Sequence, residues 1–327
     1  MKKNEEKNTT QLVVMIPAYN EEATLESVIQ SIPPKMDGIA AIHVLVIDDG
    51  STDLTTSIAR KNGARVISNH GNKGLAYTFS RGLEESLKMG ADIIVNTDGD
   101  DQYDQREIPA LIQPILSGKA DIVLGSRFAG YIEEMPFSKK MGNRLASWIL
   151  SRVSGYRNLT DGQTGFRAFT RDAAMRLNIL SGFTYTQEMI IDAADKGLVL
   201  SEIPCTFRKR AGKSRLFNGI LDYFKRAVST IIIGNLKLHP ISTFSAAGII
   251  LTVGGIAIGL PVIDNFIRTG AIGPAFLMRA LVTSLLFIIG IEIAALGLIA
   301  ALIKQNRQLV EKQLYESRKA RFSKMEI

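Results

Sequence analysis

Short apolar runs alternate with segments of helical spacing over the first part of the chain. The apolar runs predict buried strands at Leu12–Ile16, Ile42–Ile47, Arg65–Ser68, Asp92–Asn96 and Asp121–Leu124. Apolar residues recurring every three or four positions predict helices at Glu21–Ile32, from Asp53 to about Asn62, at Lys73–Met89 and at Gln105–Ser117. Strands that are apolar throughout and alternate with helices predict an α/β domain, with a mostly parallel sheet covered on both faces.

Polar clusters follow three of these strands. They read PAYNEE after the first strand, DDGSTD after the second and TDGDDQ after the fourth. Ligands of such sheets bind at the carboxyl ends of the strands. We therefore expect the three clusters to meet in one crevice.

Two later segments are apolar enough to cross a membrane. Ile241–Ile263 has no charged residue, and Ala280–Ile303 contains only Glu292. About 20 apolar residues span the hydrocarbon core of a bilayer. We expect a multi-pass protein of the cell membrane or an internal membrane, with the catalytic domain on the cytosolic face. The expected segments are a catalytic domain (1–215), interfacial amphipathic helices (216–239), a two-helix transmembrane hairpin (240–303) and a basic cytosolic tail (304–327).

The net charge of +7 is concentrated before the first apolar segment. Eight basic residues and one acid lie between Thr206 and His239. Beside a membrane span, this pattern favours contact with anionic headgroups or phosphate rather than with nucleic acid. The single cysteine, Cys205, excludes an internal disulfide.

Asp98 and Asp100 are the strongest candidates for metal ligands. They lie two residues apart after an extended strand, so their carboxylates are expected on the same side. Two carboxylates suit Mg²⁺ and leave coordination positions for diphosphate oxygens. The alternative is a solvated acidic loop. At the neighbouring strand end, Asp49 is expected to contact a base or ribose, or to cap the next helix.

The ordered motifs resemble those of inverting family 2 glycosyltransferases. PAYNEE, DDGSTD, an NKG-led helix, TDGDDQ, GSRF, DGQTGFRAF and RAGKSR occur in the order seen in that family. They are most similar to the dolichyl- or polyprenyl-phosphate mannosyl- and glucosyltransferases. The resemblance implies a GT-A fold and a Mg²⁺ or Mn²⁺ cofactor. It implies metal or diphosphate contacts from Asp98, Asp100 and Gln102.

The resemblance also implies roles for residues that bind the two substrates. For the nucleotide sugar it implies Pro17, Tyr19, Glu21, Asp49, Asp98, Gly99, Asp100, Arg208, Arg210 and Arg215. For the acceptor phosphate we expect Arg127, Arg144, Lys213 and Ser214, although Arg144 and Trp148 could equally pack in the core. Asp100 and Arg127 are the expected catalytic residues. Asp101 departs from the family pattern, which leaves open how three adjacent carboxylates divide the metal.

The expected reaction is inverting transfer of mannose or glucose to a polyprenyl or dolichyl phosphate. GDP-mannose and UDP-glucose are both possible donors. One alternative is a transferase acting on another membrane lipid, and another is a silent subunit that only binds nucleotide sugar. Glu292 is costly to expose to lipid, which suggests a homo-oligomer through the transmembrane helices.

Overall fold

The computed structural model describes residues 9–179, 185–209, 229 and 231–323. It divides the chain into two compact units. The α/β unit contains Met1–Ile231 and Gln313–Ile327, and the helical unit contains Ile232–Lys312.

The described part of the α/β unit contains a mixed sheet in the order β3-β2-β1-β4-β6-β5-β7. The strands are β1 (Gln11–Ala18), β2 (Ala41–Asp48), β3 (Arg65–Ser68), β4 (Ile93–Asn96), β5 (Ile122–Ile132), β6 (Arg167–Thr170) and β7 (Leu200–Phe207). Among the described strands, β6 alone runs antiparallel, against both β4 and β5. The predicted α/β fold with a mostly parallel sheet is confirmed, while β6 and β7 were not expected.

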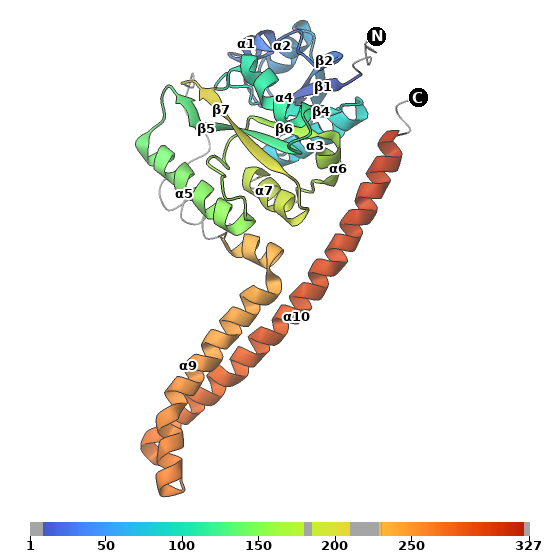
Figure 1. Cartoon of the computed structure of the whole chain (residues 1–327). Helices are drawn as coiled ribbons and strands as arrows, with labels where there is room; N and C mark the ends of the chain where they lie inside the picture. The colour runs from blue at the N-terminus through green and yellow to red at the C-terminus, as the bar shows by residue number, and fades with distance from the viewer. Residues whose placement is uncertain (1–8, 180–184, 210–228, 230, 324–327) are drawn as a thin grey trace, which may run out of the picture. The chain divides into compact units, whose positions relative to one another are not determined.

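Helices cover both faces of this sheet (Figure 1). They are α1 (Leu25–Ser31), α2 (Thr55–Lys61), α3 (Leu75–Lys88), α4 (Ile108–Leu116), α5 (Phe137–Ser154), α6 (Arg171–Arg176) and α7 (Tyr185–Asp195), with a 3₁₀ turn, η1 (Gln105–Glu107). In β1, Leu12, Val14 and Ile16 share one core with residues of α1, α2 and α4. Met15 points to the opposite face, where a Cβ added to Gly82 of α3 would lie 2.9 Å from its Sδ. The alternation along β1 thus builds two helical layers around one buried sheet.

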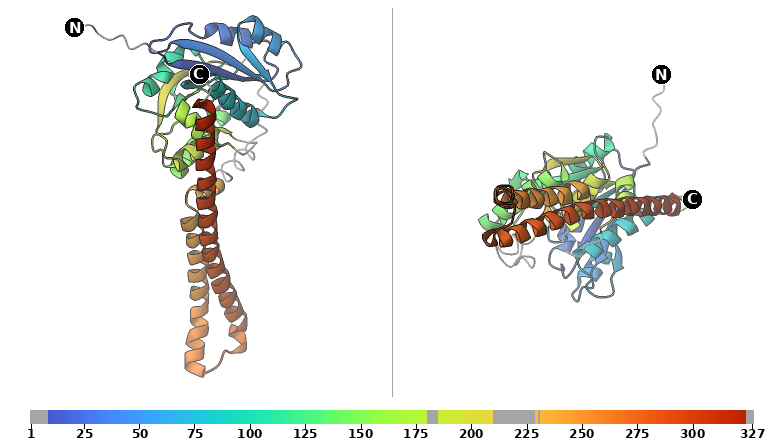
Figure 2. Two further views of the ribbon diagram at one scale, coloured as in Figure 1. Left: turned by 90° about the vertical axis from the view of Figure 1, so that its right-hand side faces the viewer. Right: turned by 90° about the horizontal axis from the view of Figure 1, so that it is seen from below.

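The helical unit contains α9 (Pro240–Thr269) and the part of α10 (Pro274–Ser323) up to Lys312. The two helices run side by side (Figures 1 and 2). Glycines allow the close approach, since a Cβ added to Gly255 would lie 3.0 Å from Cβ of Leu286. Both helices are long and apolar enough to cross a membrane, with mean hydropathies of 2.2 and 2.7 in their most apolar windows.

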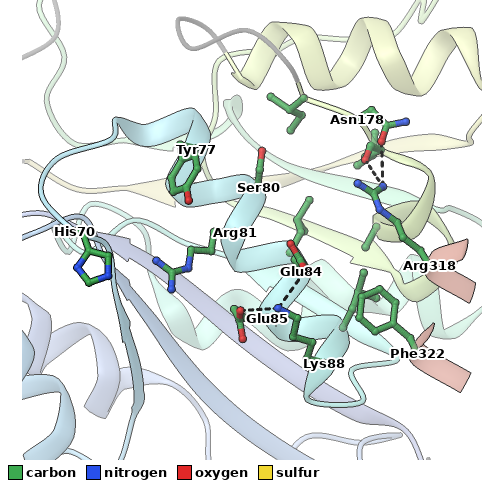
Figure 3. A pocket seen from close by; sticks show the side chains of 15 residues that line it. His70, Tyr77, Ser80, Arg81, Glu84, Glu85, Lys88, Asn178, Arg318 and Phe322 are labelled. Carbon is green, nitrogen blue, oxygen red and sulfur yellow. Dashed lines mark hydrogen bonds and ion pairs between the residues drawn. The ribbon is translucent and has the colours of Figure 1, made fainter. Parts of the chain in front are cut away.

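The end of α10 packs within the α/β unit. Tyr315 donates to the carboxylate of Asp172 at 2.6 Å, and Phe322 is 1% exposed. Nη1 of Arg318 donates to the carbonyl of Met175 at 2.8 Å, at the end of α6. A cavity of about 500 Å³ lies between this end of α10 and α3 (Figure 3). Its lining includes none of the predicted site residues that the structure describes.

Candidate active site

The PAYNEE and DDGSTD loops are joined by hydrogen bonds in both directions. The amide of Asn20 donates to Oγ of Ser51 at 2.9 Å, and the amide of Thr52 donates to Oδ1 of Asn20 at 2.8 Å. The amide of Glu21 donates to Oγ1 of Thr55 at 2.9 Å. Asn20 has a φ of 54°, which asparagine adopts more readily than most residues. The two loops therefore form one surface at the carboxyl ends of β1 and β2.

The PAYNEE segment also contacts the TDGDDQ loop. Oγ1 of Thr24 donates to the carbonyl of Gly99 at 2.7 Å. The side chain of Glu21 packs over Gly99, where an added Cβ would lie 3.5 Å from its Cγ. Pro17 lies near the end of β1 and Tyr19 follows the strand. The structure therefore brings these predicted nucleotide contacts to the ends of adjacent strands.

The carboxylate of Asp49 organises the segment that leads into α3. It accepts hydrogen bonds from the amide of Lys73 at 2.8 Å, the amide of Gly74 at 2.9 Å and Nδ2 of Asn69 at 2.8 Å. Asp49 is only 5% exposed. Both carboxylate oxygens thus hold the loop, and the expected contact of Asp49 with a nucleotide remains a prediction.

Asp101 differs in conformation from the other carboxylates of its loop. Its φ is 55°, and its Oδ2 accepts from Oγ of Ser27 in α1 at 3.0 Å. Its Oδ1 lies 3.5 Å from Nη1 of Arg208. Oδ1 of Asp100 instead accepts from the amide of Gln102 at 3.3 Å. The structure thus separates Asp101, which is tied to α1, from its neighbour Asp100.

Asp98 lies against the backbone of the DGQTGF loop. A Cβ added to Gly165 would lie 2.6 Å and 2.8 Å from the two carboxylate oxygens of Asp98. The carbonyl of Gly165 accepts from Nδ2 of Asn96 at 2.6 Å, and its amide donates to the hydroxyl of Tyr103 at 2.9 Å. Burial raises the pKa of Tyr103 well above its usual value, so its hydroxyl stays protonated. The position of Gly165 is therefore fixed from both sides, and glycine is needed beside the Asp98 carboxylate.

The oxygen atoms of this loop fit a hard divalent cation. Asp98 and Asp100 offer carboxylates and Gln102 offers an amide oxygen. Among the described residues, no group of three His, Cys, Asp or Glu side chains gathers at metal-binding distance. Mg²⁺-type sites commonly use one or two carboxylates, with waters and substrate phosphates completing the shell. The donor set therefore suits a cation shared with a diphosphate better than a site closed by protein alone.

Arg208 is anchored beside the TDGDDQ loop. Its Nη2 lies 2.9 Å from Oδ2 of Asp104, and its amide donates to the carbonyl of Gln102 at 2.7 Å. The hydrogen bond from Arg106 is the main cause that lowers the pKa of Asp104, and Arg208 adds to it. The side chain of Arg208 stays 32% exposed, so it remains accessible to an anion.

Arg127 forms a buried ion pair with Asp161. Its Nε and Nη2 donate to the two carboxylate oxygens at 2.6 and 2.8 Å, and the residue is 5% exposed. Burial alone would lower the pKa of Arg127, but the surrounding groups, Asp161 foremost, together raise it. Glu202 supports the pair by accepting from the amides of Thr160 and Asp161 at 2.8 and 2.9 Å. A phosphate would have to approach the remaining guanidinium nitrogen, and the catalytic role of Arg127 remains a prediction.

The alternatives for Arg144 and Trp148 can be compared directly on α5. Both side chains are exposed, so they do not pack in the core of the chain. The guanidinium of Arg144 lies 5.3 Å from the ring centre of Phe128, next to Arg127. Contact with an acceptor remains a prediction for Arg144.

Part of the predicted site lies outside the described residues, namely Arg210, Lys213, Ser214 and Arg215. In contrast, Tyr103 and Arg167 lie at the site but were not singled out from the sequence. Arg167 is 0% exposed although it carries a charge. The available signals were an arginine inside the DGQTGFRAF motif and an aromatic residue directly after TDGDDQ.

Comparison with known proteins gives the family. The model of glycosyl transferase family 2 matches residues 13–177. The chain belongs to this family. The predicted glycosyltransferase activity and GT-A type of fold are therefore confirmed.

Individual relatives of this glycosyltransferase add detail. The low-salt glycan biosynthesis hexosyltransferase Agl6 of Haloferax volcanii is 34% identical, over 63% of this chain and 49% of that protein. The match thus spans about half the length of that relative. The dolichyl-phosphate hexose transferase of the same organism is 32% identical, over 63% of this chain and 86% of that protein. Glucosyl-3-phosphoglycerate synthase from Mycobacterium tuberculosis, solved with Mn²⁺, UDP-glucose and phosphoglyceric acid, is 26% identical over 69% of this chain and 79% of that chain, with a TM-score of 0.53.

Proposed function

We propose that this glycosyltransferase moves a hexose from a nucleotide diphosphate sugar to a polyprenyl or dolichyl phosphate, with inversion at the anomeric carbon. The observation that carries the proposal is a paired-carboxylate strand end, Asp98 and Asp100, in a chain with two helices apolar enough to span a membrane. A relative named for dolichyl phosphate and hexose supports the acceptor class. UDP-glucose, bound by a solved relative, and GDP-mannose are the proposed donors.

A divalent cation is proposed as the cofactor. Asp98, Asp100 and Gln102 would hold Mg²⁺ or Mn²⁺, and a solved relative contains Mn²⁺. When bound, such a cation offsets the negative charge that develops on the departing nucleoside diphosphate. We assign Asp101 a supporting part, because its carboxylate accepts from Ser27 of α1.

The proposed reaction is a single displacement. An oxygen of the acceptor phosphate forms the new bond to the anomeric carbon, while the bond from that carbon to the diphosphate breaks and its electrons leave with the nucleotide. A phosphate monoester has a second pKa of about 6, so its oxygen needs no strong general base. The protein must instead bring two anions together. For the donor we propose Pro17, Tyr19, Glu21, Asp49, Gly99, Arg208, Arg210 and Arg215, and for the acceptor phosphate Arg127, Arg144, Lys213 and Ser214.

An exposed apolar face on α5 supports a lipid acceptor. Phe137, Met141, Leu145 and Trp148 are 78%, 50%, 55% and 57% exposed. Their spacing puts them on one face of the helix. Apolar side chains gathered on a surface helix favour contact with a membrane or a partner. Because α5 also carries Arg144, this face would hold the lipid beside the proposed phosphate contact.

We propose a multi-pass membrane location with the catalytic domain on the cytosolic face. The length and hydropathy of α9 and α10 support the two spans. Basic residues on the catalytic side of both spans, including Lys237 and Lys304, support the orientation. Protease protection of sealed membrane vesicles, read with tags at residue 1 and in the loop at 270–273, would test it.

A homo-oligomer through α10 is also proposed. One face of α10 carries exposed residues spaced alternately four and three positions apart, the heptad spacing of helices that pack against each other. They are Leu281, Leu285, Ile288, Glu292, Ala295, Ile299 and Leu302. Facing lipid, Glu292 would cost about 2.5–3.5 kcal/mol, by analogy with other acids at a span centre. Native mass spectrometry should show an oligomer that Glu292→Leu loses and Glu292→Gln keeps. An unchanged oligomer in Glu292→Leu would remove this role.

Transfer assays test the proposed reaction. Detergent-purified protein is incubated with labelled GDP-mannose or UDP-glucose, with or without Mg²⁺ or Mn²⁺, and with polyprenyl phosphate, diacylglycerol or 3-phosphoglycerate. We expect labelled polyprenyl phosphate only with a cation present. Transfer confined to diacylglycerol or phosphoglycerate would reject the acceptor. Donor binding without transfer to any acceptor would reject the enzymatic role in favour of a silent subunit.

The two adjacent carboxylates provide a matched pair of variants. Asp100→Asn should lower the rate by about a thousandfold, since a catalytic cation supplies several kcal/mol. Asp101→Asn should lose far less, because asparagine tolerates the positive φ and can still accept from Ser27. Equal losses in both variants would overturn the assignment of Asp98 and Asp100 as the principal ligands.

A further inference from the structure

Arg167 is a fully buried cation beside the proposed metal site. It is 0% exposed, and the hydrogen bonds found for its side chain all go to backbone carbonyls. Burying a guanidinium is costly unless its donors are satisfied and an opposite charge is near. The position of this residue therefore needs an explanation beyond packing.

The three carbonyls bonded to Arg167 belong to two separate segments. Nε donates to Thr164 at 2.8 Å and Nη2 donates to Gly162 at 3.1 Å, both in the DGQTGF loop. Nη1 donates to Thr186, in the first turn of α7, at 3.1 Å. The planar guanidinium thus fixes the shape of the loop and joins it to α7.

The loop that Arg167 holds forms the wall behind Asp98. Its next residue, Gly165, is so close that an added Cβ would lie 2.6 Å from Oδ2 of Asp98. Any shift of the loop would change the space available to this carboxylate. Asp98 is also among the charges that act on Arg167, offsetting in part the burial that lowers the pKa of that guanidinium.

A nearby arginine shows which part of this arrangement is unusual. Arg171, four residues later at the other end of β6, also donates to backbone carbonyls, those of Ala91 at 3.2 Å and Phe322 at 3.3 Å. These contacts join the start of α6 to the residues just before β4 and to the end of α10, at the opposite end of β6 from Asp98. Arg171 therefore also bonds backbone carbonyls, but these hydrogen bonds do not involve the Gly162–Gly165 turn behind Asp98.

We propose that Arg167 is a positioning residue for the cation site: it holds the Gly162–Gly165 turn against the Asp98 carboxylate and so keeps Asp98 oriented toward the metal. This inference rests on the proposed metal role of Asp98. Partners that orient metal ligands typically contribute about 10–100-fold to metal affinity. Arg167 would act through the loop, without touching the substrate or the cation.

Mn²⁺ binding provides a test that does not depend on turnover. Electron paramagnetic resonance measures free Mn²⁺ in titrations of the detergent-purified full chain, alone and with UDP or GDP. We expect Arg167→Met to weaken Mn²⁺ binding by about tenfold or more. Arg167→Lys should be only partly rescued, because an ammonium cannot reach three carbonyls in one plane. Melting curves establish that each variant is folded at the temperature of the titration.

Glycine substitutions test the wall without removing the buried charge. Gly165→Ala should also weaken Mn²⁺ binding by about tenfold, because the new methyl group displaces the Asp98 carboxylate. Gly82→Ala of α3 is the control outside this turn, since its Cβ would meet Sδ of Met15 at 2.9 Å instead. Arg171→Met is the control for the arginine. Both controls are expected to lower the melting temperature and leave Mn²⁺ affinity within about twofold of the parent.

The outcomes separate this inference from the proposed function. Weaker Mn²⁺ binding in Arg167→Met and Gly165→Ala, but in neither control, supports the positioning role. Parental affinity in folded Arg167→Met and Gly165→Ala overturns it while leaving the metal site intact. If Arg167→Met does not fold, Arg167→Lys and Gly165→Ala decide the question in the same way. If the parent protein binds no Mn²⁺ with either nucleotide, the metal site itself fails, and this inference fails with it.

Discussion

The two halves of the candidate site are held together by different forces. On the β1–β2 side, loops are joined mostly by neutral hydrogen bonds between side chains and amides, such as those of Asn20 with Ser51 and Thr52. On the β5–β6 side, the same edge depends on buried charges, Arg127 with Asp161 and Arg167 with backbone carbonyls. Neutral bonds can be lost one at a time at small cost, whereas a buried charge that loses its partner is strongly unfavourable.

The sharpest test of this difference is Asp161→Asn. Removing one member of a buried ion pair costs about 3–5 kcal/mol, because the other charge stays buried without compensation. Denaturant unfolding of the detergent-purified protein should show a loss of this size. The double variant Arg127→Met with Asp161→Leu should recover much of it. A loss below about 1 kcal/mol for Asp161→Asn would mean that this half does not depend on the pair.

One charged group on the β1–β2 side is Asp49, whose carboxylate accepts from two amides and Asn69. Asp49→Asn removes the charge and an acceptor, so we expect a loss of about 2 kcal/mol, within the range for hydrogen bonds to charged groups. Asp48→Asn is the matched control, because Asp48 accepts from the amide of Ser51 through one oxygen, at 2.9 Å, which asparagine retains. Equal losses in these neighbours would contradict the special role of Asp49.

The pH dependence of stability tests the charged half through a smaller effect. Burial is the main cause that raises the pKa of Glu202, against the amides that donate to it. Because the folded-state pKa lies above the unfolded value, the stability contributed by its protonation is present at low pH and is lost as pH rises through the folded pKa. Relative to Glu202→Gln, the parent should therefore gain stability as pH falls from 7 toward the ordinary value of 4.5. Parallel melting-temperature profiles for the two proteins would exclude this effect.

The first half of the candidate site was predictable from sequence because its strands are continuous apolar runs ended by polar motifs. The predicted strand at Ile42–Ile47 became β2, Ala41–Asp48. In the second half, the predicted strand at Asp121–Leu124 became the start of β5, Ile122–Ile132, but β6 and β7 were not predicted. The reason is that β6 is four residues long and begins with Arg167, while β7 contains Glu202 and Pro204. A buried arginine and a strand with a proline contradict the local pattern, and only contacts distant in sequence make them favourable. The same holds for the left-handed conformation of Asp101, whose Ser27 partner is 74 residues away.

Of these variants, Ser27→Ala should lower the free energy of unfolding least. It tests a neutral hydrogen bond on the β1–β2 side. It removes one exposed hydrogen bond to Asp101, at 3.0 Å, so we expect a loss of about 0.5 kcal/mol by denaturant unfolding. Ser31→Ala is the control on the same helix, because its hydroxyl bonds only locally, to the carbonyl of Val28 at 3.0 Å. Mn²⁺ affinity should be unchanged in both, since Asp98 and Asp100 keep their own surroundings. A clear loss of Mn²⁺ binding in Ser27→Ala alone would show that Asp101 shares the cation, and would make this side of the candidate site as dependent on charge as the other.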